Sequence, residues 1–208
     1  MAPRPLTLSP DASYLIAGFG GIGQSLARWL AEHGAKNLIF ASRSGAKRPA
    51  MKQLIEELEE LKVRVEPLSV DVTDGQALKS ELQRIATYMP PIRGMIQAAM
   101  VLDDQIFENM SLDSFNHAIR PKVDGTWNLH EATIGQPVDF FVILSSAVGV
   151  LGNPGQANYS AGNTYQDALA SYLRSIGRPA TAIDLGLMID VGAVAEEESG
   201  VKLRNLKR

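Results

Sequence analysis

The architecture of this chain can be read from one segment, Tyr14-Leu15-Ile16-Ala17-Gly18-Phe19-Gly20-Gly21-Ile22-Gly23. A short apolar run ends in glycines, and apolar residues then recur with a helical period over 22–33 until Gly34. Glycines between a strand and a helix let the backbone turn tightly and approach a pyrophosphate at the helix N-terminus. The spacing Gly-x-Gly-x-x-Gly therefore predicts a dinucleotide-binding loop, with a plain tight turn as the alternative.

Strands and helices alternate along the rest of the chain. Apolar runs predict strands over 37–41, 63–70, 92–98, 139–144 and 180–185, and helical periods predict helices over 49–61, 78–86, 111–119, 123–132 and 157–175. This alternation predicts an α/β fold, a three-layer doubly wound parallel sheet of the Rossmann type. Because no linker or internal repeat interrupts the pattern, we expect one domain over 1–208.

Composition excludes several classes of function. The 208 residues are 45% apolar and 21% charged, with a net charge of −3, so neither disorder nor a basic field for nucleic acid or an anionic membrane is expected. The chain has no cysteine, which rules out disulfides and thiolate metal sites. Together with the lack of an apolar targeting segment behind Met1, this favours a cytoplasmic location for the protein. The three histidines lack metal-ligand spacing, so we expect no metal, with His117 and His130 on helix surfaces.

The second predicted strand bears on the choice of cofactor. It ends in Ala41-Ser42-Arg43-Ser44, without the acid that binds a ribose 2′-hydroxyl in NAD enzymes. Arg43 can stack on adenine and pair with a 2′-phosphate, which favours NADPH/NADP+; a solvated loop arginine is the alternative. Asp71 and Val72, after the third strand, are placed to contact the adenine edge, although Asp71 suits a turn or cap nearly as well. The expected cofactor-binding residues are Gly18, Gly20, Gly21, Ile22, Gly23, Ser42, Arg43, Ser44, Asp71, Val72, Ala98 and Ala99.

The chemistry is indicated by Leu144-Ser145-Ser146-Ala147-Val148-Gly149 and the following Asn153-Pro154-Gly155-Gln156-Ala157-Asn158-Tyr159-Ser160-Ala161-Gly162-Asn163. The first part reads as the end of a buried strand and a small-residue loop, and the second leads into the first turn of a helix. A serine hydroxyl, a tyrosine phenol and an asparagine amide then share one neighbourhood. That set suits proton donation to a carbonyl oxygen whose carbon receives a hydride, which predicts a carbonyl reductase.

In combination, four segments resemble the ketoreductase domain of polyketide synthases, a branch of the short-chain dehydrogenase/reductase superfamily. They are 14–44, 91–99, 120–130 and 139–184. Gln97-Ala98-Ala99-Met100 and Asp184-Leu185-Gly186 resemble the fungal highly reducing synthases in particular. The resemblance covers 13–190 and implies NADPH-dependent reduction of a β-keto intermediate carried on an acyl carrier protein, next to other synthase domains.

The resemblance also implies roles for individual residues. Tyr159 matches the proton donor and Ser146 the serine that binds the carbonyl oxygen; Ser145, its neighbour on a strand, should face away. In most of the superfamily a lysine lies four residues after the tyrosine, whereas here Asn163 has that position and Lys122 lies on an earlier helix. Lys122 is then expected to lower the pKa of Tyr159, and Asn163 to support the proton path.

A further set of residues matches the family's stereocontrol pattern. Leu102-Asp103-Asp104 matches a Leu-Asp-Asp signature with Asp104 as the diagnostic acid, and Pro154 and Asn158 fit its companion pattern. Leu151 stands where the opposite class carries a tryptophan. The resemblance implies a D-configured β-hydroxyl product, and an acidic loop tip is the alternative interpretation of Asp104.

Three departures from the family support alternative hypotheses. The glycine loop is one residue shorter than the family's usual loop, which would alter the phosphate geometry and weaken NADP binding. We expect no N-terminal structural subdomain, since Tyr14 already lies in the first strand, and the tail over 191–208 does not resemble the family's lid and last strand. The alternatives are a catalytically silent ketoreductase relic and a stand-alone tailoring reductase of a free small carbonyl compound. A missing lid would leave the site open to water and lower kcat.

Overall fold

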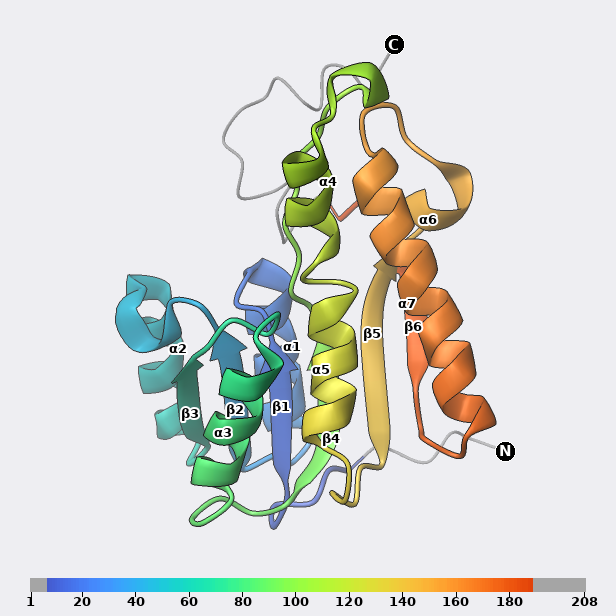
Figure 1. Ribbon diagram of the computed structural model, residues 1–208. Helices are drawn as coiled ribbons and strands as arrows, with labels where there is room; N and C mark the ends of the chain where they lie inside the picture. The colour runs from blue at the N-terminus through green and yellow to red at the C-terminus, as the bar shows by residue number, and fades with distance from the viewer. Residues whose placement is uncertain (1–6, 189–208) are drawn as a thin grey trace, which may run out of the picture.

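The computed structural model describes residues 7–188, and its strands form one parallel sheet (Figure 1). The strands are β1 (Ser13–Ala17), β2 (Asn37–Ser42), β3 (Arg64–Ser69), β4 (Ile92–Gln97), β5 (Phe140–Ser146) and β6 (Thr181–Leu185). Their order is β3-β2-β1-β4-β5-β6, so the chain proceeds outward from β1 to one edge and then returns to build the other half. The reversal lies between β1 and β4, where open α/β sheets bind ligands.

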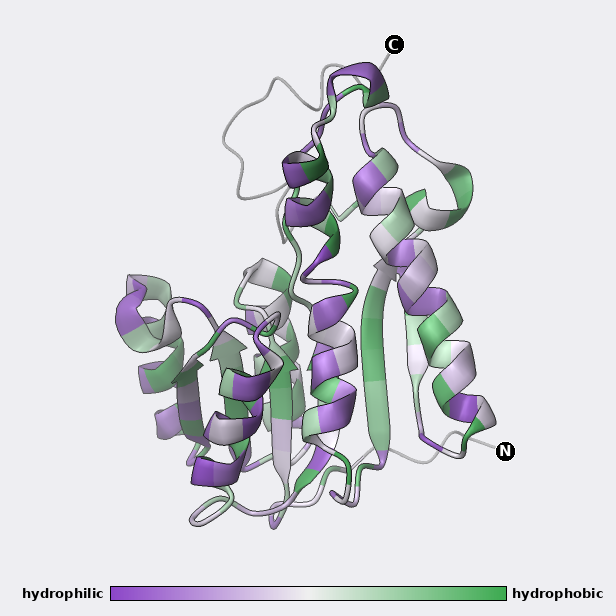
Figure 2. Ribbon diagram, viewed as in Figure 1, coloured by the Kyte–Doolittle hydropathy of each residue, from purple (hydrophilic) through white to green (hydrophobic). Residues whose placement is uncertain are grey.

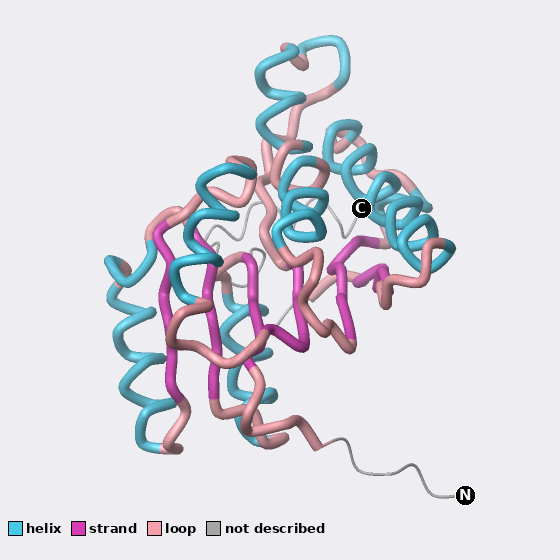
Figure 3. Tube along the Cα trace, turned by 60° about the horizontal axis from the view of Figure 1, so that its bottom comes forward, coloured by secondary structure: helices cyan, strands magenta, loops and turns pink. Residues whose placement is uncertain are grey.

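Helices cover both faces of this sheet. They are α1 (Gly21–Glu32), α2 (Pro49–Glu60), α3 (Gly75–Ile85), α4 (Leu112–Ile119), α5 (Asp124–Ala132), α6 (Val148–Leu151) and α7 (Ala157–Ser175), with the 3-10 turns η1 (Gly45–Lys47) and η2 (Phe107–Asn109). Side chains of α1 and α2 pack on one face, and those of α3, α5 and α7 on the other. The tube view in Figure 3 shows the strands between these two layers.

The core is divided between the two faces because side chains alternate along a strand. Leu15 and Ile39 face the side of α3, α5 and α7, whereas Tyr14 and Phe40 face α1 and α2, and all four are nearly inaccessible to solvent. In Figure 2 the central strands are mostly hydrophobic, whereas the helices carry both hydrophilic and hydrophobic residues. Burying one large apolar side chain contributes about 1.5–3 kcal/mol, so both faces stabilise the sheet.

The sequence-based prediction of the fold class is confirmed, with local differences. The segment expected to be a loop after β5 contains the short helix α6, and β5 itself continues through Ser145 and Ser146. The expectation that His130 lies on a helix surface is wrong: it is 7% exposed, against the edge of Trp127. Burial also lowers the pKa of its imidazole. The tail over 191–208 lies outside the described residues.

Local signals explain where several helices begin. The Asp74 carboxylate accepts a hydrogen bond from the Ala77 amide at the start of α3, and Ser111 caps α4 in the same way through Ser114. Pro121 lies between α4 and α5, where its missing amide hydrogen interrupts the helical ladder. That break places Lys122 just before α5, and its side chain reaches β5.

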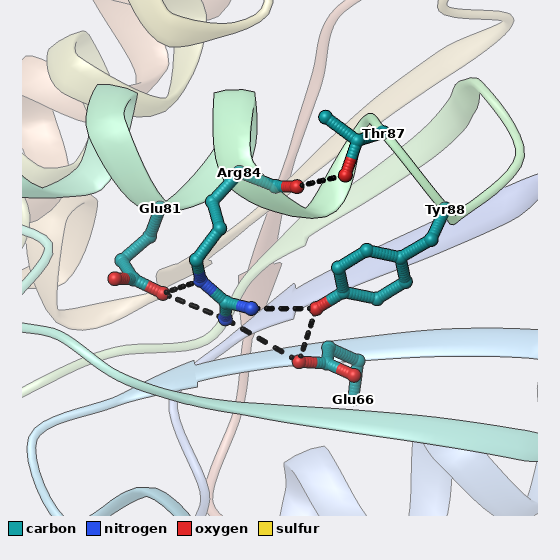
Figure 4. A network of polar contacts seen from close by, with 5 residues as sticks. All are labelled: Glu66, Glu81, Arg84, Thr87 and Tyr88. Carbon is teal, nitrogen blue, oxygen red and sulfur yellow. Dashed lines mark hydrogen bonds and ion pairs between the residues drawn. The ribbon is translucent and has the colours of Figure 1, made fainter.

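A polar cluster on the surface joins α3 to β3 (Figure 4). Arg84 donates hydrogen bonds to Glu81 and to the Tyr88 hydroxyl, which in turn donates to Glu66. Exposed ion pairs of this kind contribute little to stability, so the cluster mainly orients the turn after α3. Between residues 7 and 188, no helix is both long and apolar enough to cross a bilayer.

Candidate active site

A cavity of about 620 Å³ opens at the carboxyl ends of the central strands. Its walls come from the loops after β1, β2, β3 and β4, so it occupies the point where the strand order reverses. Every residue expected to bind the cofactor lines this one cavity. The residues that sequence reasoning missed are Phe19, Ala41, Arg48, Val70, Met100, Val101, Leu102 and Pro121.

The glycine loop forms one wall of the cavity, and at two of its positions a residue larger than glycine would not fit. Gly18 has φ +100°, and a Cβ at that position would lie 2.7 Å from backbone atoms of Ala98 and Ala99. A Cβ on Gly23 would lie 2.6 Å from the Gly18 carbonyl oxygen. Gly20 instead has open space where a Cβ would be, next to the first amides of α1. The loop can therefore bring a ligand close to a helix N-terminus.

The far end of the cavity, after β2, carries two arginines. Arg43 and Arg48 both line it, and Arg48 donates a hydrogen bond of 2.8 Å to the Phe19 carbonyl and lies over the Phe19 ring. The buried Ser42 hydroxyl has no hydrogen-bond partner among the described residues. Two guanidinium groups and an unsatisfied hydroxyl at one end suit an anionic group such as a phosphate.

Asp71 lines the cavity and also holds a turn. Its Oδ1 accepts a hydrogen bond from the Thr73 amide at 2.9 Å, an arrangement typical of an Asx turn. The turn interpretation of Asp71 is therefore confirmed. Its contact with an adenine edge stays a prediction, as does that of the buried Val72 beside it.

Tyr159 and Lys122 lie together, and Tyr159 contacts one residue of the cavity wall. Tyr159, in the first turn of α7, points its hydroxyl to the sulfur of Met100 at 3.9 Å, and Met100 lines the cavity. The Lys122 amine lies 5.0 Å from the centre of the Tyr159 ring. Residues distant in sequence are thus brought to one place, as the ketoreductase resemblance implies.

The pKa of Tyr159 is raised above its ordinary value, chiefly by burial. Hydrogen bonding by Asn163 and Ser146 opposes this shift, and the carboxylate of Asp104 adds to it. That Lys122 lowers the phenol's pKa stays a prediction, and burial outweighs any such effect in the net shift. The Lys122 amine lies over the face of the Tyr159 ring, and burial lowers its own pKa, which weakens its positive charge at neutral pH.

Lys122 is itself an unusual lysine, with an exposed fraction of 2%. Its amine donates hydrogen bonds to the Leu144 carbonyl at 3.1 Å and to Gln166 Oε1 at 3.0 Å. Burial lowers its pKa to about 7, although the carboxylate of Asp167 opposes the shift. The amine can therefore gain or lose a proton near neutral pH.

The serines and Asn163 occupy distinct positions. Ser146 Oγ accepts a hydrogen bond from the Val148 amide at 3.3 Å and lies near enough to Tyr159 to affect its pKa. Ser145 is buried and bonds to the Asn163 carbonyl, so it faces away, as expected from the strand. Asn163 donates to the Tyr159 carbonyl at 2.8 Å, while its own buried Oδ1 has no partner among the described residues.

The expected stereocontrol residues are only partly brought together. Asp104 accepts a hydrogen bond from Gln156 at 2.9 Å, and Asn158 donates to the Asp103 carbonyl at 2.8 Å. These bonds hold the loop after β4 against the loop before α7. Leu151 on α6 is 82% exposed, and Pro154 is exposed as well.

Comparisons with known proteins agree with this geometry. The KR domain family model matches residues 12–190. Highly reducing polyketide synthase 40 of Fusarium mangiferae is 52% identical over 197 residues, which cover 94% of this chain and 8% of that protein. The highly reducing polyketide synthase Preu1 of Preussia isomera is 49% identical over 199 residues, covering 92% of this chain and 8% of that one.

Solved structures agree as well. The ketoreductase from the first module of phoslactomycin biosynthesis in Streptomyces sp. HK803 has a TM-score of 0.87 and 32% identity, covering 98% of this chain and 48% of that one. An A-type ketoreductase from a modular polyketide synthase has a TM-score of 0.85 and 34% identity, covering 97% and 42%. The chain thus spans about 8% of the length of these curated relatives, and less than half of these solved chains.

Proposed function

This chain belongs to the KR domain family, with ketoreductases of polyketide synthases among its relatives, and from that premise we propose that it reduces a β-keto group with NADPH. One observation carries the proposal: the buried Lys122 amine lies against the Tyr159 ring, and the Tyr159 hydroxyl reaches Met100, a residue in the wall of the glycine-loop cavity. The product would be a β-hydroxyacyl thioester.

The described residues fit a nicotinamide dinucleotide. The glycine loop leaves room for a pyrophosphate at Gly20, and backbone crowding at Gly18 and Gly23 excludes any side chain there. At the other end, Arg43 and Arg48 offer positive charge to a 2′-phosphate, and the Ser42 hydroxyl, which has no partner within residues 7–188, offers a hydrogen bond; both support NADPH over NADH.

The chain's own residues then have distinct tasks. When bound, NADPH supplies a hydride, the two electrons that reduce the carbonyl carbon. Tyr159 donates its proton to the carbonyl oxygen, and its raised pKa keeps the phenol protonated at neutral pH until that oxygen becomes strongly basic. The Ser146 hydroxyl donates a hydrogen bond to the same oxygen and stabilises its developing charge. Lys122, whose pKa lies near neutral, would take up a proton from solvent and pass it to Tyr159, and Asn163, bonded to the Tyr159 carbonyl, would support that transfer.

The finer features of the reaction are part of the same proposal. Asp104, held by Gln156, and Asn158, held by the loop after β4, support delivery of the substrate from one side and a D-configured product. The substrate would arrive on an acyl carrier protein, among the other domains of a cytoplasmic polyketide synthase.

The test is a spectrophotometric assay of NADPH oxidation with a β-ketoacyl thioester of pantetheine. We expect the chain to consume NADPH and the Tyr159→Phe variant to lose that activity while still binding NADPH, because only the proton donor is removed. A free ketone serves as the second substrate. Equal kcat/KM for free and thioester ketones would favour the stand-alone reductase, and tight NADPH binding without any turnover would favour a silent relic.

A further inference from the structure

Three buried side chains connect the Lys122 amine to the wall of the cavity. Gln97, Thr126 and Gln166 each have an exposed fraction of 0%, and they come from β4, α5 and α7. Burying polar groups is costly unless each of them finds a hydrogen-bond partner. The bonds within this group settle which way each side chain is turned.

Gln166 can present only its oxygen to Lys122. Its Nε2 donates to Thr126 Oγ1 at 3.0 Å, and its Oε1 accepts from the Lys122 amine at 3.0 Å. The Thr126 hydroxyl already donates its one proton to the Lys122 carbonyl. It can therefore only accept from Gln166, which fixes the amide with its nitrogen toward Thr126 and its oxygen toward the amine.

Gln97 supports Thr126 from the other side. Its Nε2 donates to Thr126 Oγ1 at 3.3 Å and to the Pro121 carbonyl at 2.7 Å. Its Oε1 accepts a hydrogen bond from the Ala99 amide at 2.9 Å. Both lone pairs of the Thr126 hydroxyl are thus used, and the network ends at Ala99, a residue of the cavity wall.

The lysine stem leaves the amine little freedom to move. It passes α7 at Gly162, where a Cβ would lie 3.1 Å from Lys122 Cδ and 3.2 Å from its Cβ. With the stem confined, the amine depends on its two acceptors, Leu144 O and Gln166 Oε1.

We propose that Gln166, oriented by Thr126 and Gln97, is a positioning residue that holds the Lys122 amine against the Tyr159 ring and sets how readily it binds a proton. This inference deepens the proposed function and rests on it. A dipolar acceptor that is fixed in a buried place favours the ammonium form, because it replaces part of the lost hydration.

Other titratable groups also face the amine. Two of them belong to α7. The carboxylate of Asp167 favours the protonated form of Lys122, and the Tyr159 ring lies against the Lys122 amine. Asp184 on β6 acts through Asp167: desolvation raises the Asp167 pKa, and Asp184 raises it further. Since neither carboxylate is altered in the variants below, their influence on the amine is the same in each comparison.

The experiment measures the titration of Lys122 directly, by the pH dependence of the carbon chemical shift next to its amine in the full chain. The variants are Gln166→Leu, Gln166→Glu, Thr126→Val and, as the matched control, Thr126→Ser. In Gln166→Leu the Lys122 ammonium loses its hydrogen bond to the Gln166 oxygen, so we expect the Lys122 pKa to fall by about one unit or more. Gln166→Glu raises it, and Thr126→Val, which lets the amide turn over, lowers it by a smaller amount. Thr126→Ser keeps the hydroxyl and titrates like the wild type.

Kinetics provide the second readout. The pH at which kcat is half-maximal follows the same order across the variants, with little change in KM for the β-ketoacyl thioester. An unchanged Lys122 titration in Gln166→Glu and Thr126→Val would overturn the proposal, even if Gln166→Leu failed to fold. If the wild type binds NADPH without turnover, the proposed function fails while the titration still tests the positioning role.

Discussion

Replacing Lys122 by methionine should remove a pH dependence of stability that this one amine creates. The folded chain holds the Lys122 pKa at about 7, against an ordinary value of 10.5 that applies to the unfolded chain. Between those pH values the unfolded chain binds more protons, so the free energy of unfolding rises with pH across this window. Below pH 7 both states are protonated and the full penalty of the buried charge remains.

The magnitude follows from the two pKa values. Integrating the proton difference from pH 7 to pH 9 gives an increase of about 2 kcal/mol in the free energy of unfolding from Lys122 alone. This window avoids the imidazole of His130, whose pKa is lowered, and the phenol of Tyr159, whose pKa is raised. Lys122→Met also loses its hydrogen bonds, but that loss does not vary with pH.

The assay is urea denaturation of the wild type, Lys122→Met and the control Lys52→Met at pH 7, 8 and 9. Lys52 is exposed on α2, so its loss should leave the pH dependence unchanged. Between pH 7 and pH 9, we expect the free energy of unfolding of the wild type to rise by about 2 kcal/mol relative to that of Lys122→Met. Parallel curves for these two proteins would refute the account of a buried, weakly basic amine.

Three further predictions concern the cavity walls and the loop that follows β4. Gly18→Ala should lower the free energy of unfolding, measured by urea denaturation, by about 2 kcal/mol or more, because Gly18 has a positive φ and Ala98 and Ala99 crowd the added Cβ. The control Gly135→Ala, at φ +91° with open space around the Cβ, should have a smaller effect. Equal losses in the two variants would contradict the crowding argument. Arg43→Ala and Arg48→Ala should each raise the Kd for NADPH by about tenfold in a fluorescence titration, with little change for NADH and none for Lys47→Ala; equal losses for the two cofactors would argue against a 2′-phosphate site. Asp104→Ala should lower the proportion of D product in chiral chromatography because it unties the loops that Gln156 joins, and an unchanged product would remove Asp104 from stereocontrol.

The sequence predicts the scaffold well because its signals are local. Apolar runs and helical periods need only neighbouring residues, and α7 begins and ends where its pattern predicts, at residues 157 and 175. The carboxyl ends of parallel strands meet at one edge, so the expected cofactor residues could be gathered from four loops without a structure.

What the sequence could not supply depends on packing. Arg48 follows its η1 turn with no motif around it, and only the fold brings its guanidinium to the Phe19 carbonyl. The amphipathic period of α5 does not show that His130 lies under neighbouring residues, nor do Gln97, Thr126 and Gln166 stand in any common pattern. The direction of the Tyr159 pKa shift likewise results from burial, which outweighs the groups that lower it.

The most direct test of the central claim follows the hydrogen that the substrate receives. The wild-type chain is incubated with a β-ketoacyl pantetheine thioester and NADPH carrying deuterium at the reactive carbon of the nicotinamide ring, and the product mass is measured. Hydride transfer predicts a β-hydroxyacyl product with one deuterium on the β-carbon, formed by the wild type and lost with Tyr159→Phe. Unreduced β-ketone at the end of the incubation, or an equal yield from Tyr159→Phe, would contradict the account.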